Sequence, residues 1–179
     1  MPRLSGGKSS KCKVLFHCNF CKIMLRWIRI EVGIIKKVLF VCHGNICRSP
    51  MAEFVFKELA RRAGVAAEFE VDSVAVSAEE LGNPIYPPAK AQLRSHGIPF
   101  DDHRARVLTR RDYDAADHLV VMDRSNLRGV ARICGTAEKA RLLLGDRDVS
   151  DPYYSGDFAQ TWQDIAEGCR RLLAELTEA

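Results

Sequence analysis

The stretch VLFVCHGNICRSPMAEF, residues 38–54, joins a run of β-forming residues to the start of a helix through a short polar turn. VLFVC has the apolar, Val-rich character of a buried parallel strand. The pair Ser49–Pro50 predicts that a helix begins there, with Ser49 as its N-cap, and Gly64 predicts where it ends. The residues between these two elements therefore form a strand-to-helix turn.

Strand-like and helix-like segments alternate through the rest of the chain, which is typical of a parallel sheet covered by helices. Further strands are predicted at 69–76, 118–123 and 140–144, and further helices at 87–97, 125–133 and 158–176. Right-handed crossovers then predict an α/β fold, a small doubly wound four-stranded parallel sheet with helices on both faces. The ligand site of such a sheet lies at the carboxyl ends of its strands, where Cys42 falls.

Composition excludes several classes of protein. The 179 residues are 47% hydrophobic and 28% charged, as in ordinary globular proteins. The net charge of +4 is mild, and the Arg and Lys residues are not interleaved with aromatic ones, so we expect no nucleic-acid binding. The odd number of cysteines, 7, and the lack of a clean secretory signal predict reduced thiols and a cytoplasmic location.

Residues 1–36 do not resemble the rest of the sequence. They begin with Gly, Ser and Lys residues, and charged residues interrupt every later apolar run, so we expect no membrane span. They contain one C-x2-C pair but no second pair at zinc-finger spacing, so we expect no metal. We treat 1–36 as an N-terminal extension of uncertain status, with Met24 as an alternative start, and 37–179 as the functional domain.

The turn after the first strand has the composition of an anion-binding loop. Its residues are His43, Gly44, Asn45, Ile46 and Cys47, followed by Arg48. Inward-pointing N–H groups and the positive end of the helix dipole attract an anion. Gly44 and Asn45 tolerate the left-handed backbone that a concave loop needs. The sequence therefore predicts a phosphate-binding loop after the first strand.

Cys42 and Arg48 supply the chemistry predicted for this loop. The helix N-terminus and Arg48 favour the thiolate form of Cys42, which is the nucleophilic form. The planar fork of Arg48 can hold two oxygens of a tetrahedral oxyanion. Cys42 is the only one of the seven cysteines with an arginine at this spacing. A thiolate facing a bound phosphate predicts phosphoryl transfer through a cysteinyl-phosphate.

Cleavage of a phosphate ester also requires a proton donor for the leaving oxygen. The segment DVSDPYYSGDF, residues 148–158, offers Asp151 after the fourth predicted strand and before the last predicted helix. Pro152 makes this segment rigid, and Tyr153 and Tyr154 provide flat walls for an aromatic leaving group. We therefore expect Asp151 to be the general acid.

From residue 37 to about 177, the sequence resembles the low-molecular-weight protein tyrosine phosphatase family. VCHGNICRSPMAE matches the signature C-x-G-N-x-C-R-S-P, DPYY matches the acid loop, and DS, GNP, HGIP and MD-x-SNL follow in the family's order. The resemblance implies that Cys42 is the nucleophile, Arg48 the phosphate clamp, and Asp151 the acid and later the base. It implies a phosphotyrosine-containing protein as substrate, no metal or other cofactor, and a monomer or weak dimer.

The resemblance also assigns supporting roles. It implies that the substrate is bound by His43, Gly44, Asn45, Ile46, Cys47, Ser49, Tyr153 and Tyr154, and that Ser73 and His103 support the loop. The spacing before His103 is one residue longer than usual. Cys47 matches a cysteine that forms a reversible disulfide with the nucleophile and protects it from over-oxidation. The alternative for Cys47 is a small residue that only fills the loop.

Glu79 and Glu80 depart from the family pattern, which commonly has an aromatic residue before GNP. They leave two alternatives to a strong phosphotyrosine preference: substrates with basic residues beside the phosphate, and phosphoarginine. Ile46 argues against phosphoarginine, because related arginine phosphatases carry a threonine there. Arsenate reduction on the same scaffold needs a close downstream cysteine pair, and only Cys134 and Cys169, far apart in sequence, remain.

Overall fold

The computed structural model describes residues 35–178, so the predicted extension at 1–36 lies almost entirely outside the described residues. Four parallel strands form one sheet: β1 (Lys36–Cys42), β2 (Phe69–Ala75), β3 (His118–Val121) and β4 (Ala140–Leu142). Their order is β2-β1-β3-β4, so β1 is central and the chain winds outward in both directions. This arrangement confirms the predicted doubly wound parallel sheet.

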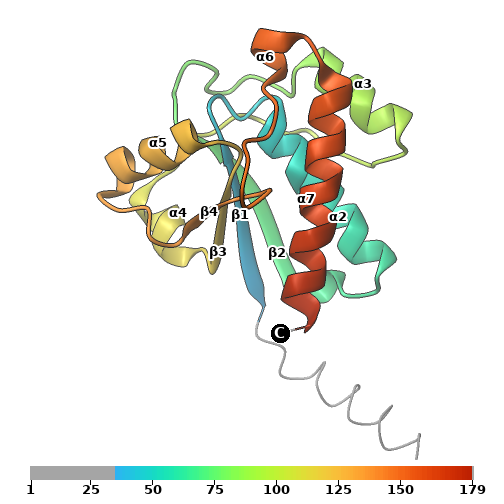
Figure 1. Ribbon diagram of the computed structural model, residues 1–179, viewed down its shortest axis with the longest axis horizontal. Coiled ribbons are helices and arrows are strands. Elements are labelled where there is room, and N and C mark those ends of the chain that lie inside the picture. The colour runs from blue at the N-terminus through green and yellow to red at the C-terminus, as the bar shows by residue number, and fades with distance from the viewer. Residues whose placement is uncertain (1–34, 179) are drawn as a thin grey trace, which may run out of the picture. The chain divides into compact units, whose positions relative to one another are not determined.

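Helices cover both faces of the sheet, as predicted (Figure 1). Helices α2, α3 and α7 lie on one face, and α4 and α5 lie on the other. The helices are α2 (Arg48–Arg62), α3 (Pro87–Ser95), α4 (Arg110–Ala115), α5 (Arg124–Cys134), α6 (Pro152–Ser155) and α7 (Phe158–Glu178), and a 3-10 turn, η1 (Ala66–Glu68), precedes β2.

Strand β1 divides the core into two hydrophobic clusters because its successive side chains point to opposite faces. Val38 and Phe40 pack in the cluster that contains residues of α2 and α7. Leu39 and Val41 pack in the cluster that contains residues of α5. Cys42, the last residue of β1, continues the α2 side, and this places its thiol under the start of α2.

Helix α2 begins two residues earlier than predicted, at Arg48, and the prediction that Ser49 is its N-cap was wrong. Cys47 occupies the N-cap position and makes no side-chain capping hydrogen bond. Ser49 lies within the first turn, where its hydroxyl contacts the preceding loop instead. The predicted stop is confirmed, because α2 ends at Arg62 and Gly64 follows with φ 74°.

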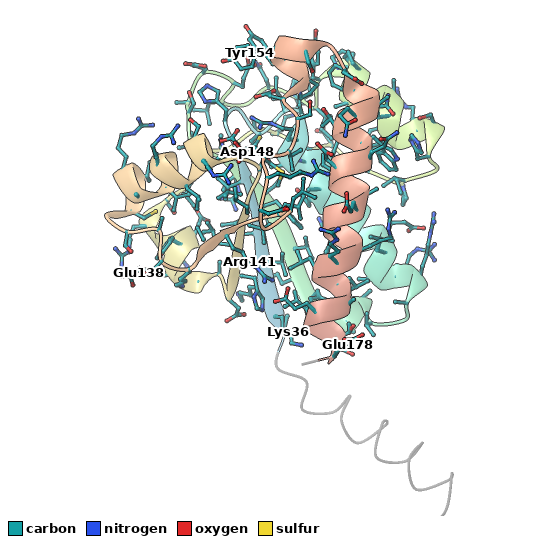
Figure 2. All side chains as sticks on the ribbon, in the orientation of Figure 1. Lys36, Glu138, Arg141, Asp148, Tyr154 and Glu178 are labelled. Carbon is teal, nitrogen blue, oxygen red and sulfur yellow. The ribbon has the colours of Figure 1, made fainter. Side chains whose placement is uncertain are left out.

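The carboxyl ends of the strands and the segment of α6 lie toward the same end of the sheet. In Figure 2, Tyr154 of α6 marks this end, and Lys36 and Glu178 mark the opposite end. Within residues 35–178, we find no helix that combines the length and the apolar character needed to span a membrane.

Candidate active site

The loop between β1 and α2 turns its carbonyl groups outward. Five of its carbonyl oxygens accept hydrogen bonds from donors around the loop. The Cys42 and His43 carbonyls accept from the main-chain N–H groups of Val76 and Ser77, which follow β2. The Asn45 carbonyl pairs with His103 Nε2, and the Ile46 carbonyl accepts from the Tyr86 N–H. The Cys47 carbonyl accepts from the Met51 N–H, which is the first hydrogen bond of α2. Because successive carbonyls are tied to the outside, the loop can present N–H groups to its centre, which suits an anion.

The thiol of Cys42 faces the polar interior of this loop. Cys42 is only 3% exposed, yet its Sγ accepts a hydrogen bond from the Asn45 N–H at 3.2 Å. The Ser49 Oγ lies 3.0 Å from the same sulfur. A cysteine that serves only as a core hydrophobe needs no such partners, so the polar contacts set Cys42 apart from a packing residue.

Asn45 holds the loop in shape from a left-handed backbone conformation, with φ 56°. Its side chain is fully buried and donates to Ser49 Oγ and to Ser73 Oγ, both at 2.9 Å. Its Oδ1 accepts from the Arg106 N–H at 3.1 Å. Asparagine is one of the few residues that tolerates this conformation, and here all of its polar atoms are also used.

Gly44 does not adopt the left-handed conformation that we expected of it, since Asn45 takes that role. The lack of a side chain at Gly44 has another reason. A Cβ placed there would lie 2.9 Å from the Glu80 Cγ, closer than real Cβ contacts allow. Glycine therefore lets the chain around Glu80 pack directly on the loop.

Ser73 and His103 are both brought to the loop, together with Glu53 of α2. The fully buried Ser73 donates to Glu53 Oε2 at 2.6 Å while accepting from Asn45. His103 Nε2 lies 2.9 Å from the Asn45 carbonyl oxygen, and its Nδ1 lies 3.9 Å from Glu53 Oε2. The carboxylate of Glu53 thus anchors Ser73 directly and lies close to His103 without a hydrogen bond to it.

Arg48 is a buried cation held between two aspartates. Its Nη1 is 2.7 Å from Asp123 Oδ2, and its Nη2 is 2.5 Å from Asp151 Oδ2. Burial opposes the charge, but nearby anionic groups, Cys42 first and then the two aspartates, outweigh it and raise the pKa of Arg48. The guanidinium is therefore fixed in orientation and permanently charged.

Asp151 lies next to Arg48, at the end of the loop between β1 and α2, although it comes from a distant segment. Its carboxylate pairs with Arg48 and also accepts from the Tyr153 N–H at 3.1 Å, as the N-cap of the four-residue helix α6. About a quarter of its side chain is exposed, 25%. The carboxyl group is therefore ordered but still accessible to a ligand in the loop.

Tyr153 and Tyr154 stand on the surface beside this carboxyl group. They are 80% and 85% exposed and pack edge to face, with ring centroids 5.3 Å apart. Such exposed aromatic rings can serve as a contact surface for an aromatic substrate. They lie on the same short helix that Asp151 caps.

His43 and Glu79 form a pair on the rim of the loop. His43 Nε2 lies 2.9 Å from Glu79 Oε2, and both side chains are exposed. Glu80 packs against Gly44 and accepts from Asn83 Nδ2 at 2.7 Å. The rim thus carries two carboxylates at the position where the resemblance predicts an aromatic wall.

Cys47 is a neutral thiol in the same loop that Cys42 faces. Burial, followed by the negative charges of Cys42 and Asp151, raises the pKa of Cys47 to about 12. Cys47 and Cys42 are both free thiols in this structure. Cys47 therefore keeps its proton at neutral pH.

The sequence prediction missed Asp123 and Glu53. Asp123 comes two residues after the end of β3, and the carboxyl end of a central strand is itself a positional signal in a parallel sheet. Glu53 lies four residues after Ser49 in α2, so both side chains face the same side of the helix. Both residues lie in motifs of the sequence resemblance, but the side chains that they contact, Arg48 and Ser73, come from other segments.

Cys134 and Cys169 are the remaining free cysteines of the described residues. They are not placed next to each other, as arsenate reduction through a cysteine pair would require. Cys134 belongs to the cluster on the α5 side of the sheet, and Cys169 to the cluster on the α7 side. The sheet therefore separates them. Among residues 35–178, no group of three or more His, Cys, Asp or Glu side chains is arranged to hold a metal ion.

Solved structures with the same fold include phosphatases of two specificities. The crystal structure of YfkJ from Bacillus subtilis matches with a TM-score of 0.78 and 38% identity, covering 82% of this chain and 97% of YfkJ. The crystal structure of DARP, a drosophila arginine phosphatase, matches with a TM-score of 0.72 and 30% identity, covering 78% and 97%. The fold and the position of the loop after β1 are therefore shared.

Sequence comparison gives the same result. The Bacillus subtilis low molecular weight protein-tyrosine-phosphatase YfkJ is 42% identical over 147 residues, which cover 78% of this chain and 94% of that protein. The human low molecular weight phosphotyrosine protein phosphatase is 40% identical over 149 residues, covering 77% and 94%. The family model described as low molecular weight phosphotyrosine protein phosphatase matches residues 37–179. The chain belongs to the low molecular weight phosphotyrosine protein phosphatase family.

Proposed function

We propose that this enzyme, a phosphoric monoester hydrolase by its family, hydrolyses phosphotyrosine in proteins with Cys42 as the nucleophile. One observation carries the proposal. Arg48 joins the loop that holds the Cys42 thiol to Asp151, which comes from a segment more than a hundred residues away. A thiol, an anion cradle, a fixed cation and a carboxyl group are the four parts that phosphate-ester cleavage through a covalent intermediate needs.

In the first step, the phosphate occupies the loop and the Cys42 sulfur attacks phosphorus. The new S–P bond forms while the bond between phosphorus and the tyrosine oxygen breaks. Asp151 donates its proton to that oxygen, so tyrosine leaves as a neutral phenol. Arg48 and the inward N–H groups hold the equatorial oxygens, where negative charge is concentrated.

In the second step, water hydrolyses the cysteinyl-phosphate. Asp151, now a carboxylate, takes a proton from the water as its oxygen attacks phosphorus. The S–P bond breaks, Cys42 leaves as a thiolate, and inorganic phosphate is released. Asp151 ends the cycle protonated and ready to act as the acid again, while the Asn45 N–H and Ser49 Oγ receive the returning charge on sulfur.

Kinetics on matched phosphotyrosine and phosphoarginine peptides test this function. Cys42→Ser should abolish turnover but retain vanadate binding, and Cys134→Ser, which changes a buried thiol outside the loop, is the matched control. We expect a large excess of kcat/KM for phosphotyrosine. Turnover by Cys42→Ser would exclude Cys42 as the nucleophile, and an excess for phosphoarginine would reverse the assigned specificity.

The substrate contacts that we propose follow from the rim of the loop. Tyr153 and Tyr154 would flank the phenyl ring, since their rings are exposed beside Asp151. Ile46 and His43 would line the loop entrance. Glu79 next to His43 gives the rim a negative charge that favours peptides with a basic residue near the phosphotyrosine.

We propose a redox role for Cys47. Peroxide would convert the Cys42 thiolate to a sulfenic acid, and the Cys47 thiol would then displace water to form a disulfide. Oxidation also removes the Cys42 negative charge, which is one of the causes of the high pKa of Cys47. Mass spectrometry of peroxide-treated protein should find the Cys42–Cys47 link, and its absence would leave Cys47 as a residue that fills the loop.

We further propose a cytoplasmic enzyme that acts as a monomer or weak dimer, with a catalytic domain from residue 37 to 179. The reduced cysteines of the described part of the chain support the location. Sedimentation of the full chain and of a chain that begins at residue 35 tests the oligomeric state, and phosphatase kinetics on the same two forms test the domain boundary. We expect equal kcat/KM for the two forms.

A further inference from the structure

The segment that carries Asp151 is fastened to helix α7 by the residue immediately before it. Asp164 Oδ2 accepts a hydrogen bond from the Ser150 N–H at 2.9 Å. Thr161 Oγ1 lies 3.0 Å from the carbonyl oxygens of both Ser150 and Asp157, which share its one hydroxyl proton. Asp164 and Thr161 are at most 1% exposed. Both polar backbone groups of Ser150 are therefore held by buried side chains of one rigid helix.

Met122, just after β3, and Arg48, at the start of α2, contact the residue before Ser150. The Val149 N–H donates to the Met122 carbonyl oxygen at 2.8 Å, and the Val149 carbonyl oxygen is 3.5 Å from Arg48 Nη1. The main chain is thus clamped at residues 149 and 150, and Asp151 is the next residue. Its reach toward Arg48 depends on where this clamp places the Ser150–Asp151 peptide.

Asp164 is suited to the clamp because it is charged and fully satisfied. A buried carboxylate is costly unless its oxygens receive hydrogen bonds. Here Oδ1 accepts from Arg147 Nη1 at 2.7 Å and from Gln160 Nε2 at 2.9 Å. Burial opposes the charge, but the hydrogen bonds from Ser150 and Arg147 outweigh it and lower the pKa of Asp164. Charge-assisted hydrogen bonds are shorter and stronger than neutral ones, which makes the clamp stiff.

We propose that Asp164 is a positioning residue that sets the place of the general acid Asp151 by holding the Ser150 amide. The inference rests on the proposed function, in which Asp151 protonates the leaving oxygen. A general acid must come within about 2.6–3.2 Å of that oxygen. A misplacement of about 1 Å can cost on the order of a hundredfold in rate. Asp164 thus acts on the reaction through Asp151 without touching the substrate.

A double-mutant cycle on the full chain separates this role from a purely structural one. Asp164→Asn removes the charge and weakens the clamp, and Asp151→Asn removes the acid. We expect Asp164→Asn to lower kcat/KM for a phosphotyrosine peptide about tenfold, and by less than twofold in the Asp151→Asn background. Glu167→Gln is the matched control, because Glu167 also pairs with Arg147 but does not touch Ser150. It should leave kcat/KM unchanged.

The leaving group provides a second readout. The loss caused by Asp164→Asn should be several-fold smaller for p-nitrophenyl phosphate, whose leaving group needs less protonation. Equal losses in both Asp151 backgrounds would overturn the inference alone. No loss on Asp151→Asn itself would overturn the proposed mechanism and the inference with it. If Asp164→Asn does not fold, Asp164→Glu, which keeps the charge but displaces the carboxylate from the Ser150 N–H, enters the same cycle with the same criteria.

Discussion

Replacement of Asn45 by glycine is expected to lower the free energy of unfolding by about 2–5 kcal/mol. The Arg106 N–H would lose its acceptor, which costs about 1–3 kcal/mol for a buried donor. Ser49 and Ser73 would each lose one hydrogen bond, worth about 0.5–1.5 kcal/mol, but keep their contacts with Cys42 and Glu53. Arg106 is only half-buried, so water can replace part of the hydrogen bond that its main-chain N–H loses. The total cost is therefore below the full sum of the three hydrogen-bond terms.

Asn45→Ala removes the same hydrogen bonds and adds a backbone effect. At φ 56° an alanine is strained by about 1–2 kcal/mol. Glycine relieves that strain but costs about 0.5–1 kcal/mol in chain entropy. Alanine should therefore be less stable than glycine by about 0.5–1 kcal/mol, measured by urea unfolding with linear extrapolation. Losses below about 1 kcal/mol for both variants, or a glycine variant less stable than the alanine one, would refute this reasoning.

Three further changes test other parts of the molecule. Asp123→Asn keeps the cap of α5 but loses the charge that orients Arg48, so kcat/KM should fall about tenfold with little change in Tm; unchanged kinetics would contradict this role. In Gly168→Ala the new Cβ would collide with Leu143, which should cost about 1–3 kcal/mol of the free energy of unfolding. This cost should exceed the roughly 1 kcal/mol gained in helix propensity. Leu143→Ala in the same protein should recover part of that loss, and simple additivity would argue against the collision. Cys47→Ser should abolish most recovery of activity by thiol reductant after peroxide, and recovery equal to the wild type would exclude its protective role.

The strands and long helices were predictable because their signals are local. The apolar run of β1, the Pro-started α3 and the apolar stripe of α7 depend on neighbouring residues only. Helices α4 and α6 were missed because six and four residues are too few to show a period. A capping signal was nevertheless present for α4, where Thr109 and Asp112 form a capping box.

The parts of the candidate site that are close together in sequence were predictable, and the contacts between distant segments were not. Cys42, the turn and Arg48 lie within one short segment, so a single pattern indicates them together. Asp123 and Asp164 contact the site through Arg48 and Ser150, and although Asp123 follows a strand, neither sequence neighbourhood identifies the distant partner. Ser49 shows the opposite error, since a residue that favours the N-cap by propensity is drawn into the loop by tertiary hydrogen bonds.

The two aspartates on Arg48 differ in how easily a phosphate can replace them. Asp123 also accepts from the Asn126 N–H at 2.7 Å and caps the eleven residues of α5, so its release would cost a helix cap, about 1 kcal/mol. Asp151 caps only the four residues of α6 and is more exposed, 25% against 16%. We infer that a substrate phosphate takes the Nη2 side of Arg48 from Asp151 while Nη1 stays with Asp123. In the proposed mechanism this exchange would free the Asp151 carboxyl group when the leaving oxygen arrives beside it, so one guanidinium would both bind the phosphate and release the acid.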